Sequence, residues 1–328
     1  MPVGVTSLLW HESNFMIQHT VHTPYMVGES HFYSTEIDGD LVLFDTGPAS
    51  SHARAYLKSQ IDLRRLKYLF ITHGHVDHCG LAAYIAQNST AEILVPRKDA
   101  KKMQHHELRV AYIHQFLKEF GFDDAFAERL QGILDEKKYF PEMPRRCTIV
   151  EESDIPQKLG IDWLSCPGHS QSDLVYLCGN DAVSGDVLLR DIFQAPLLDV
   201  DMDTFTGRFR NYDAYCSSLL ELGKLRKCRI LPGHREYVNG LNDTIHFYIR
   251  KLLERAGQVK RFDGVESIKE VIGHLFGESL VDPFVIYLKA SEIVFMRDFL
   301  AEPGKLESSL ENIGLSDAVS ELYAAVTA

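Results

Sequence analysis

A nine-residue segment rich in histidine constrains this chain more than any other feature. It reads Thr-His-Gly-His-Val-Asp-His-Cys-Gly over residues 72–80, and the apolar run Leu66–Thr72 leads directly into it. Such a short apolar run is typical of a buried strand. The segment therefore places several metal-competent side chains at the end of a rigid element. These side chains are His73, His75, Asp77 and His78.

The spacing of these four side chains suits metal ligation. His73 and His75 are two residues apart in an extended segment, so they can project to the same side. Asp77 and His78 follow where the chain turns toward a helix, so they can reach a second point nearby. Imidazole nitrogens combined with a carboxylate suit zinc, iron or manganese. The pattern indicates a metal site rather than a surface loop that happens to be rich in histidine.

Three further candidates lie in short turns, each directly after a strand-like run. His169 follows Cys-Pro-Gly, Asp186 follows Val-Ser-Gly, and His234 follows Leu-Pro-Gly. Turns at the ends of strands commonly carry active-site residues, because the scaffold below them is rigid. We therefore expect these three side chains to complete the site.

The size and charge of the chain narrow its function. At 328 residues it can bury a large core, as one large domain or two of ordinary size. The 46 acidic side chains outnumber the 34 basic ones, which gives a formal net charge of −12. Binding to a large nucleic acid needs a clustered basic face. A small-molecule substrate is therefore expected.

The sequence also predicts a cytoplasmic protein. The start of the chain, Met1–Gly4, lacks a basic region followed by a long apolar stretch, so no signal peptide is expected. No stretch approaches the roughly 20 apolar residues of a membrane span, so no membrane partner is expected. The six cysteines are scattered and form no Cys-x-x-Cys pair, which is typical of reduced thiols.

Short apolar runs alternate with helical stretches up to about residue 242. Strands are expected at 40–45, 66–72, 93–96, 147–150, 161–166, 174–178, 182–184 and 228–231. Helices are expected at 53–60, 81–87 and 213–222. The frequent change of element indicates a mixed α and β domain.

Two longer regions have helical periodicity. Residues 97–139 form a predicted helical insert of about 40 residues that would cap the cleft, because a structureless loop that long is unusual. Gly121 is expected to divide the insert into two helices. The tail, 243–328, has the apolar spacing of helices that pack in a core or a dimer. We place a domain boundary at 242, so that 1–242 is the catalytic domain.

The combined pattern resembles the metallo-β-lactamase-fold superfamily over about residues 20–240. The resemblance implies an α/β fold (α+β in some schemes), an αββα sandwich of two mixed sheets with metals at one edge. It implies two divalent metal ions, and ligands without cysteine admit zinc, iron or manganese. The implied ligands of one metal are His73, His75 and His169. The implied ligands of the other are Asp77, His78 and His234, with Asp186 bridging the two.

The resemblance implies a hydrolase. Water between two divalent cations loses a proton near neutral pH, and the resulting metal-bound hydroxide attacks a carbonyl carbon or phosphorus. Asp77 can orient this nucleophile or carry its proton, besides ligating metal. Asp45 matches a family residue that ends an early strand and fixes the orientation of the ligands.

The complete set of carboxylate and histidine ligands resembles the glyoxalase II-like, dinuclear branch. The Gly-Cys-Gly-Arg segment that many glyoxalase II enzymes carry after the bridging aspartate is absent, since the chain reads Asp-Val-Leu-Leu-Arg over 186–190. This argues against glutathione thioesters but not against thioesters in general. The insert and the tail are similar in arrangement to the quinolone-signalling thioesterase of the superfamily. A small thioester or ester is therefore the expected substrate.

Three other functions fit the same ligands. A phosphodiesterase of this fold uses the same set, and a sulfur dioxygenase of this fold holds a single iron. A regulatory binding protein could keep the site only as a vestige. In that case the helical tail would form the protein contact. Whichever function holds, the sequence is also compatible with a homodimer through the helical tail or the insert.

Several other polar groups have structural interpretations. The pattern Asp199-x-Asp201-x-Asp203 begins like a calcium loop but lacks the glycine and glutamate of an EF-hand, so an acidic surface loop is expected. Cys79 is expected to pack in the core. Solvated or structural roles are expected for His105, His106 and His114. Contact with an anionic substrate or a solvated face fits Arg190, Arg208, Arg210 and Arg235.

Overall fold

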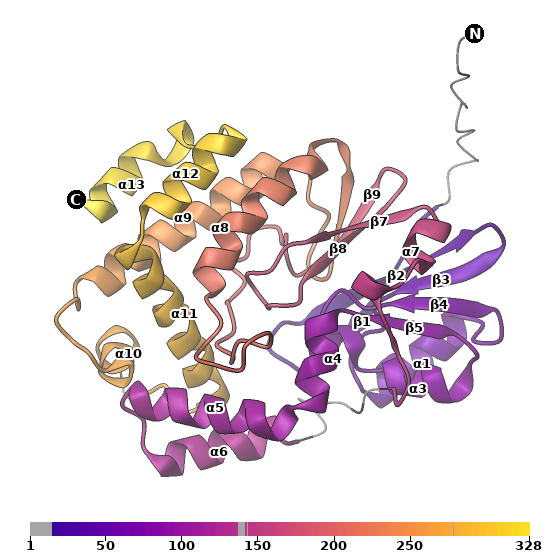
Figure 1. Cartoon of the computed structure of the whole chain (residues 1–328), viewed down its shortest axis with the longest axis horizontal. Coiled ribbons are helices and arrows are strands. Elements are labelled where there is room, and N and C mark those ends of the chain that lie inside the picture. The colour runs from indigo at the N-terminus through magenta and orange to yellow at the C-terminus, as the bar shows by residue number, and fades with distance from the viewer. Residues whose placement is uncertain (1–14, 137–141, 143, 278) are drawn as a thin grey trace, which may run out of the picture.

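The computed structural model describes residues 15–136, 142, 144–277 and 279–328. The first residues, Met1–Gly4, and the end of the expected insert, 137–139, lie outside the described residues. Two β-sheets lie side by side in the right half of Figure 1, and most helices of the insert and the tail fill the left and lower left of the view.

The first sheet is mixed and has its six strands in the order of the sequence. They are β1 (Ile17–His22), β2 (Glu29–Ile37), β3 (Asp40–Phe44), β4 (Leu66–Phe70), β5 (Glu92–Val95) and β6 (Thr148–Ile149). Pairs β1–β2 and β2–β3 are antiparallel, and the pairs from β3 to β6 are parallel. The turn between β2 and β3 has positive φ at both Asp38 and Gly39, which suits a tight hairpin.

The second sheet contains four strands in the order β10-β9-β8-β7. They are β7 (Ile161–Ser165), β8 (Leu174–Cys178), β9 (Asp181–Gly185) and β10 (Arg229–Pro232). Only the pair β9–β10 is parallel, so this sheet is also mixed.

The two sheets pack face to face through a buried aromatic layer. Phe44 and Phe70 of the first sheet stack at 5.4 Å between ring centroids, and Tyr176 of the second sheet contacts both rings. Tyr176 also donates a hydrogen bond to the Ile71 carbonyl at 2.7 Å, and Tyr33 donates one to the Pro232 carbonyl at 2.7 Å. These contacts fix the position of one sheet against the other.

Helices complete a four-layer αββα sandwich. On the first sheet lie α1 (Ser51–Gln60) and α3 (Ala82–Asn88), whose buried residues join a core cluster with that sheet. On the second sheet lie α8 (Asn211–Leu222) and α9 (Leu241–Lys260). This arrangement confirms the expected fold.

Shorter elements complete the sandwich: α2 (Val76–Cys79), α7 (Ile155–Lys158) and the 3₁₀ helices Val150–Glu152, Gly223–Lys227 and Asp317–Val319. The strand expected at 147–150 is wrong at its end, because the chain leaves the sheet after Ile149 and enters a 3₁₀ turn with Val150 buried.

The insert consists of α4 (Arg97–Gln104), α5 (His106–Glu119) and α6 (Asp124–Leu134). Gly121 has φ +88° just after α5, a left-handed conformation that favours glycine and ends the helix as expected. Val110, Ile113, Phe116 and Leu117 form the buried side of α5.

The helical tail continues from α9 into α10 (Ile268–Phe276), α11 (Pro283–Ala301), α12 (Gly304–Ile313) and α13 (Ser320–Thr327). Asp282 accepts hydrogen bonds from the Phe284 and Val285 backbone and caps α11, with Pro283 in its first turn. The apolar residues of α9 join one core cluster with Val175 and Ile230 of the second sheet. They form core contacts of this chain, and the domain boundary at 242 stays a prediction.

Among the described helices, none combines the length and the apolar character that crossing a membrane requires.

The shared core predicts how the tail contributes to stability. Leu252 of α9 is fully buried in the cluster that includes the second sheet. Leu252→Ala should lower the free energy of unfolding of the whole chain by about 2–5 kcal/mol, through lost burial and a cavity. Leu220→Ala on α8, where the leucine is 45% exposed, should change it by less than about 0.5 kcal/mol. Urea unfolding followed by tryptophan fluorescence and circular dichroism measures both; an effect confined to a separate tail transition would contradict the shared core.

Candidate metal centre

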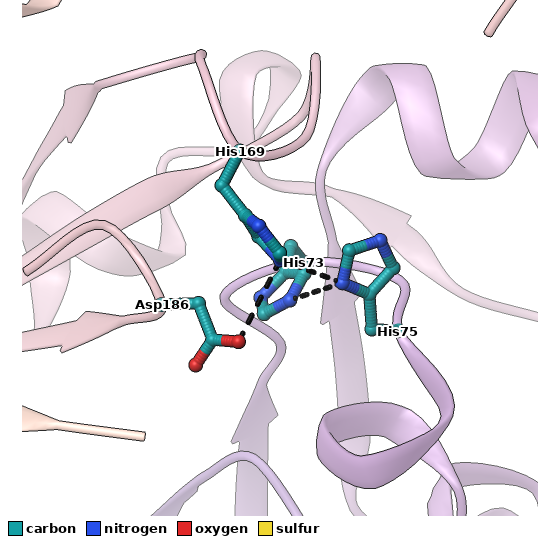
Figure 2. A group of neighbouring side chains, drawn as sticks. All are labelled: His73, His75, His169 and Asp186. Atoms are coloured by element: carbon teal, nitrogen blue, oxygen red, sulfur yellow. Dashed lines mark hydrogen bonds and ion pairs between the residues drawn. The ribbon is translucent and has the colours of Figure 1, made fainter. Parts of the chain in front are cut away.

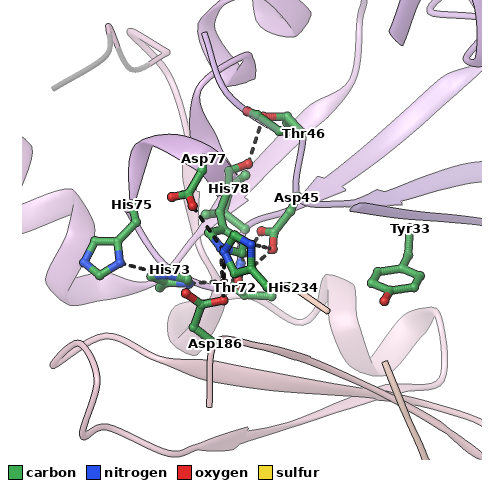
Figure 3. Close-up of polar contacts among 12 residues, drawn as sticks. Tyr33, Asp45, Thr46, Thr72, His73, His75, Asp77, His78, Asp186 and His234 are labelled. Carbon is green, nitrogen blue, oxygen red and sulfur yellow. Dashed lines mark hydrogen bonds and ion pairs between the residues drawn. The ribbon is translucent and has the colours of Figure 1, made fainter. Parts of the chain in front are cut away.

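The candidate ligands follow four strands, and the supporting Asp45 follows a fifth; Figure 3 shows these side chains together, His169 excepted. Asp45 follows β3 directly, and the histidine-rich segment follows β4. His169, Asp186 and His234 follow β7, β9 and β10. Active-site residues of α/β proteins gather in this way at the carboxyl ends of strands. All seven side chains expected as ligands lie in two neighbouring groups.

Three ring nitrogens converge in the first group (Figure 2). Nε2 of His73 lies 2.9 Å from Nδ1 of His75, and Nε2 of His169 lies 2.9 Å from the same Nδ1. Such close nitrogens suit ligands that share one small cation, since each would lie about 2.0–2.1 Å from zinc.

The second group consists of Asp77, His78 and His234 (Figure 3). Nε2 of His234 lies 3.2 Å from Oδ2 of Asp77. Asp77 and His78 both lie on the single-turn helix α2, so the turn expected after His75 brings them to this group.

Asp186 lies between the two groups. Its Oδ1 is 3.2 Å from Nε2 of His78 and 3.5 Å from Nε2 of His234. Its Oδ2 is 3.6 Å from Nε2 of His169 in the first group. One oxygen therefore faces each group, which is the arrangement that a bridging carboxylate requires.

Hydrogen bonds on the far side of the rings orient two of the histidines. Nδ1 of His169 donates to the Ala195 carbonyl at 2.8 Å, and Nδ1 of His234 donates to the Glu29 carbonyl at 2.6 Å. A carbonyl only accepts, so these bonds place the hydrogen on Nδ1 and leave the Nε2 lone pair directed at the group.

The tail holds the loop that supports His169. Phe193 stacks on Tyr248 of α9 with ring centroids 4.4 Å apart, and Arg255 lies 4.4 Å above the Phe193 ring. The Leu198 backbone N–H donates to Ser291 of α11 at 3.0 Å. Residues 193–198, which include the Ala195 carbonyl, are therefore positioned by the tail helices α9 and α11.

Buried atoms without hydrogen bonds test whether a metal fits. Nε2 of His78, Nε2 of His234 and Oδ1 of Asp186 are sealed from solvent, and none makes a hydrogen bond. Leaving buried polar atoms unsatisfied costs roughly 1–3 kcal/mol each, and more when a group is charged. A cation among these three atoms would satisfy all of them, so the donor set fits a metal.

Burial and neighbouring charges set the ionisation of the first group. Burial lowers the pKa of His73 and His75 well below the usual value, and burial also lowers the pKa of His169. These rings are therefore neutral at pH 7, which is the form that binds a metal.

In the second group, neighbouring charges favour the charged forms of the side chains, in contrast to the first group. Burial disfavours the charged form of His78, but the carboxylates of Asp186 and Asp77 outweigh it and raise its pKa well above the usual value. Burial raises the pKa of Asp77, but His78 and His234 outweigh it and lower that pKa to about 2. Without a metal, protons on His78 and His234 therefore balance the carboxylate charge of this group, and a bound cation would replace those protons.

Asp45 supports both the strand edge and a ligand. It accepts hydrogen bonds from the backbone N–H and the hydroxyl of Thr72, both at 2.8 Å. Its Oδ2 also lies 2.9 Å from Nδ1 of His78 and directs the other nitrogen of that ring toward the second group. Its φ of +60° is left-handed, a conformation that aspartate and asparagine tolerate better than most residues. This position agrees with the supporting role expected of Asp45.

At two positions of the site only glycine fits, because neighbouring atoms lie too close to leave room for a Cβ. A Cβ on Gly233 would lie 2.4 Å from Cε1 of His78 and 2.7 Å from Oδ1 of Asp186. A Cβ on Gly74 would lie 2.7 Å from Oδ1 of Asp99. Any larger residue would displace a candidate ligand at position 233, or the buried Asp99 carboxylate at position 74.

A cavity of about 300 Å³ opens onto the ligands and gives the site a substrate-sized space. The insert contributes Lys102, Arg109 and Leu134 to its wall. Most of the remaining apolar wall comes from the loop after Asp186 and from α11: Leu189, Ile192, Phe193, Leu197, Phe284 and Leu288. The insert, the loop and the tail thus enclose the cavity together.

The prediction of an acidic surface loop at 199–203 is wrong for Asp199. This residue is only 5% exposed, and both its carboxylate oxygens accept a hydrogen bond from Nε of Arg109, at 2.8 and 2.9 Å. Asp203 is more exposed and pairs with Lys98 and Lys101 of the insert. The loop therefore attaches the insert to the catalytic domain.

A buried network of polar side chains beside Gly74 was not predicted from the sequence. The Lys102 ammonium lies 3.1 Å from Oδ1 of Asp99 and 3.0 Å from the Ser170 hydroxyl. Ser172 donates a hydrogen bond to the same Asp99 oxygen at 2.7 Å. The network joins α4 to the segment that carries His169, and no local motif indicates it.

Three of the four arginines considered for substrate contact have side-chain partners within the protein. Arg208 forms a bidentate pair with Asp298 of the tail, and Arg210 pairs with Asp213 and Glu302. Arg190 pairs with Glu236 at 2.5 Å. The backbone carbonyl of Arg235 accepts a hydrogen bond from His31 at 2.6 Å.

The structural roles expected of the other histidines and Cys79 agree with the structure. His106 pairs with Asp135, and His114 pairs with Asp124, each at 3.1 Å. The His105 ring packs edge-on against Phe205. Cys79 is buried in the core beside the first sheet.

Comparison with known proteins identifies the family. The profile of the metallo-beta-lactamase superfamily matches residues 28–234, which include every candidate ligand. The chain therefore belongs to the metallo-beta-lactamase superfamily, whose members are generally metal-dependent hydrolases. No curated protein matches the sequence significantly.

Solved structures share the fold at low sequence identity. A metallo-beta-lactamase family protein from Thermus thermophilus is 17% identical, with a TM-score of 0.69 over 88% of this chain and 94% of that one. A beta-lactamase domain protein from Burkholderia ambifaria is 18% identical, with a TM-score of 0.70 over 88% of this chain and 87% of that one. These likenesses concern the fold alone.

The contacts of Asp45 generate a prediction about metal affinity. Asp45→Asn keeps the shape and tolerates the left-handed backbone, but the neutral amide supports the Thr72 donors and His78 less well. We expect metal affinity to fall by about 10–100-fold, as for other residues that orient ligands. Competition with a chromogenic chelator measures this. Asp38→Asn is the control, since Asp38 is exposed and also has a positive φ of +52°. Equal affinities for the two variants would contradict the role of Asp45.

Proposed function

We propose that this chain is a dinuclear metal-dependent hydrolase that cleaves a small, largely apolar thioester or ester. The observation that carries the proposal is Asp186, whose two oxygens face two complete ligand groups at the mouth of an apolar cavity. The superfamily match shows a family whose members are generally metal-dependent hydrolases. The proposal adds the number of metals and the class of substrate.

The geometry supports two metals. The first group offers His73, His75 and His169, and the second offers Asp77, His78 and His234. Asp186 contributes one oxygen to each. A single-iron dioxygenase would leave the second group, with its unsatisfied nitrogens on His78 and His234, without a function. Zinc, iron and manganese all suit these ligands.

When bound, two divalent cations would activate a water and polarise the carbonyl that it attacks. The chain itself must hold and guide the reacting groups. Asp77 directs Oδ2 toward His234, while its Oδ1 has no hydrogen-bond partner among the described residues, and Asp77 lines the cavity. Oδ1 of Asp77 is therefore available, and we assign to it the role of accepting the proton of the attacking water and passing it to the leaving group.

The cavity wall supports an acyl substrate. Leucine, isoleucine and phenylalanine side chains dominate the part away from the ligands, and such a wall excludes water from an apolar chain. The acidic net charge argues against large nucleic acids. We infer a monomeric site, since the tail helices are used in the chain's own core, and a cytoplasmic location from the scattered cysteines.

Metal content tests the two-site arrangement. The purified chain should contain two divalent ions, measured by inductively coupled plasma mass spectrometry. His234→Ala removes a ligand of the second group and should leave about one ion per chain. His114→Ala should keep two, because His114 pairs with Asp124 on the insert, away from the ligands. A single iron in the unaltered chain, with oxygen consumption on glutathione persulfide, would favour the dioxygenase.

Turnover tests the substrate class. The metal-replete chain should hydrolyse the hexanoyl thioester of N-acetylcysteamine with a higher kcat/KM than bis-p-nitrophenyl phosphate. Asp77→Asn should lower kcat by about 10²–10⁴-fold, the usual contribution of a positioned proton acceptor. His114→Ala should retain activity.

A reversed order of the two substrates would make the chain a phosphodiesterase. No turnover of thioesters, esters, lactones or the phosphodiester, with both metals bound, would favour the regulatory protein.

A further inference from the structure

One charged side chain in the cavity wall, that of Arg109, donates hydrogen bonds to the protein through only one of its three nitrogens. Arg109 of α5 lines the same cavity as His75 and His169, and its side chain is 13% exposed. A buried arginine is unusual beside the leucine, isoleucine and phenylalanine side chains that supply much of the apolar wall. Its contacts therefore show what it can still bind.

The guanidinium is held in place through one nitrogen. Nε donates to both oxygens of Asp199, at 2.8 and 2.9 Å. Asp199 is itself buried, and its Oδ1 accepts the Val200 backbone N–H at 2.9 Å. The nearby carboxylate keeps Arg109 charged despite burial. The ion pair thus fixes the plane of the guanidinium.

The two terminal nitrogens of Arg109 are unused. Among the described residues none accepts a hydrogen bond from Nη1 or Nη2. Neither nitrogen is among the polar atoms sealed from solvent without a partner, so both are open to the cavity that Arg109 lines. Two parallel N–H donors of a fixed guanidinium match the two oxygens of a carboxylate.

Lys102 does not offer the same possibility. Its ammonium has three donors, and three acceptors surround it: Asp99 at 3.1 Å, Ser170 at 3.0 Å and Ser172 at 3.4 Å. The charge of Lys102 is therefore used inside the protein. Arg109 is the cation of the cavity wall that retains free donors among the described residues.

We propose that Arg109 determines specificity by binding a carboxylate carried by the substrate at the end of its apolar acyl chain. The substrate class is then a half-thioester or half-ester of a dicarboxylic acid, with an apolar spacer along the leucine and phenylalanine wall. The assignment of the reacting group rests on the proposed function, whereas carboxylate binding by Arg109 does not.

A matched pair of substrates tests this specificity. The adipoyl and hexanoyl thioesters of N-acetylcysteamine have six-carbon acyl chains and differ only in a terminal carboxylate or methyl group. The full-length chain should prefer the adipoyl thioester by about tenfold or more in kcat/KM, as expected for a bidentate charge-assisted contact. The double variant Arg109→Gln/Asp199→Asn removes both charges together, so no buried charge is left alone, and should reduce the ratio to near one.

Two further variants separate specificity from folding. Arg109→Lys keeps the charge beside Asp199 but lacks the planar fork, so it should give an intermediate ratio. Arg129→Gln removes an exposed arginine of α6 on the same insert and should keep the full ratio. Thermal unfolding followed by circular dichroism shows whether the double variant folds. If it does not fold, the substrate ratio of Arg109→Lys decides whether Arg109 determines specificity.

A binding measurement does not depend on turnover. Calorimetric titration of the purified chain with 4-phenylbutanoate and with uncharged 4-phenylbutan-1-ol should show a preference for the carboxylate that falls about tenfold in the double variant. A carboxylate bound only at the metals would keep its preference in that variant.

The outcomes separate the two proposals. If neither the thioesters nor the corresponding esters are hydrolysed, the proposed function fails, and the titration alone decides whether Arg109 binds a carboxylate. A preference that is absent in the unaltered chain, or that persists in both Arg109 variants, would overturn the inference.

Discussion

The cost of burying charged and polar ligand atoms is the constraint on which the site depends. Five of the seven candidate ligands are buried, and His75 and His169 are partly exposed because they line the cavity. Desolvated imidazole and carboxylate groups need partners, or they destabilise the fold. The protein supplies partners on the outer side of His78, His169 and His234, as Asp45 does for His78. The inner atoms are left to the metals, so metal binding and folding stability are coupled.

The ligands could be predicted from the sequence because each lies in a short local pattern. His73, His75, Asp77 and His78 are close together along one turn, and the other three follow apolar runs that end in glycine. Strands β1 and β2 received no separate prediction. Much of β2 is buried on both faces and includes the polar residues His31 and Ser34, so it lacks the alternation of apolar and polar residues that indicates a strand.

The cavity wall could not be predicted, because its contacts join residues far apart in the chain. Arg109 and Asp199 are separated by 90 positions, and no local pattern indicates that they pair. Asp199 even belongs to a run of alternating aspartates that suggests a solvated loop. Its burial depends on how the insert folds over the loop after Asp186, and that packing is set by tertiary contacts rather than by local spacing.

The support of His169 has a consequence for engineering a minimal enzyme. The Ala195 carbonyl that orients this ring belongs to a loop held by Tyr248 and Ser291, both beyond residue 242. A fragment that ends at residue 234, where the family match ends, would keep every candidate ligand but lose the contacts that orient His169. The shortest active version of this protein is therefore longer than its catalytic motifs suggest, and α9 and α11 must be retained or replaced in any graft of this centre.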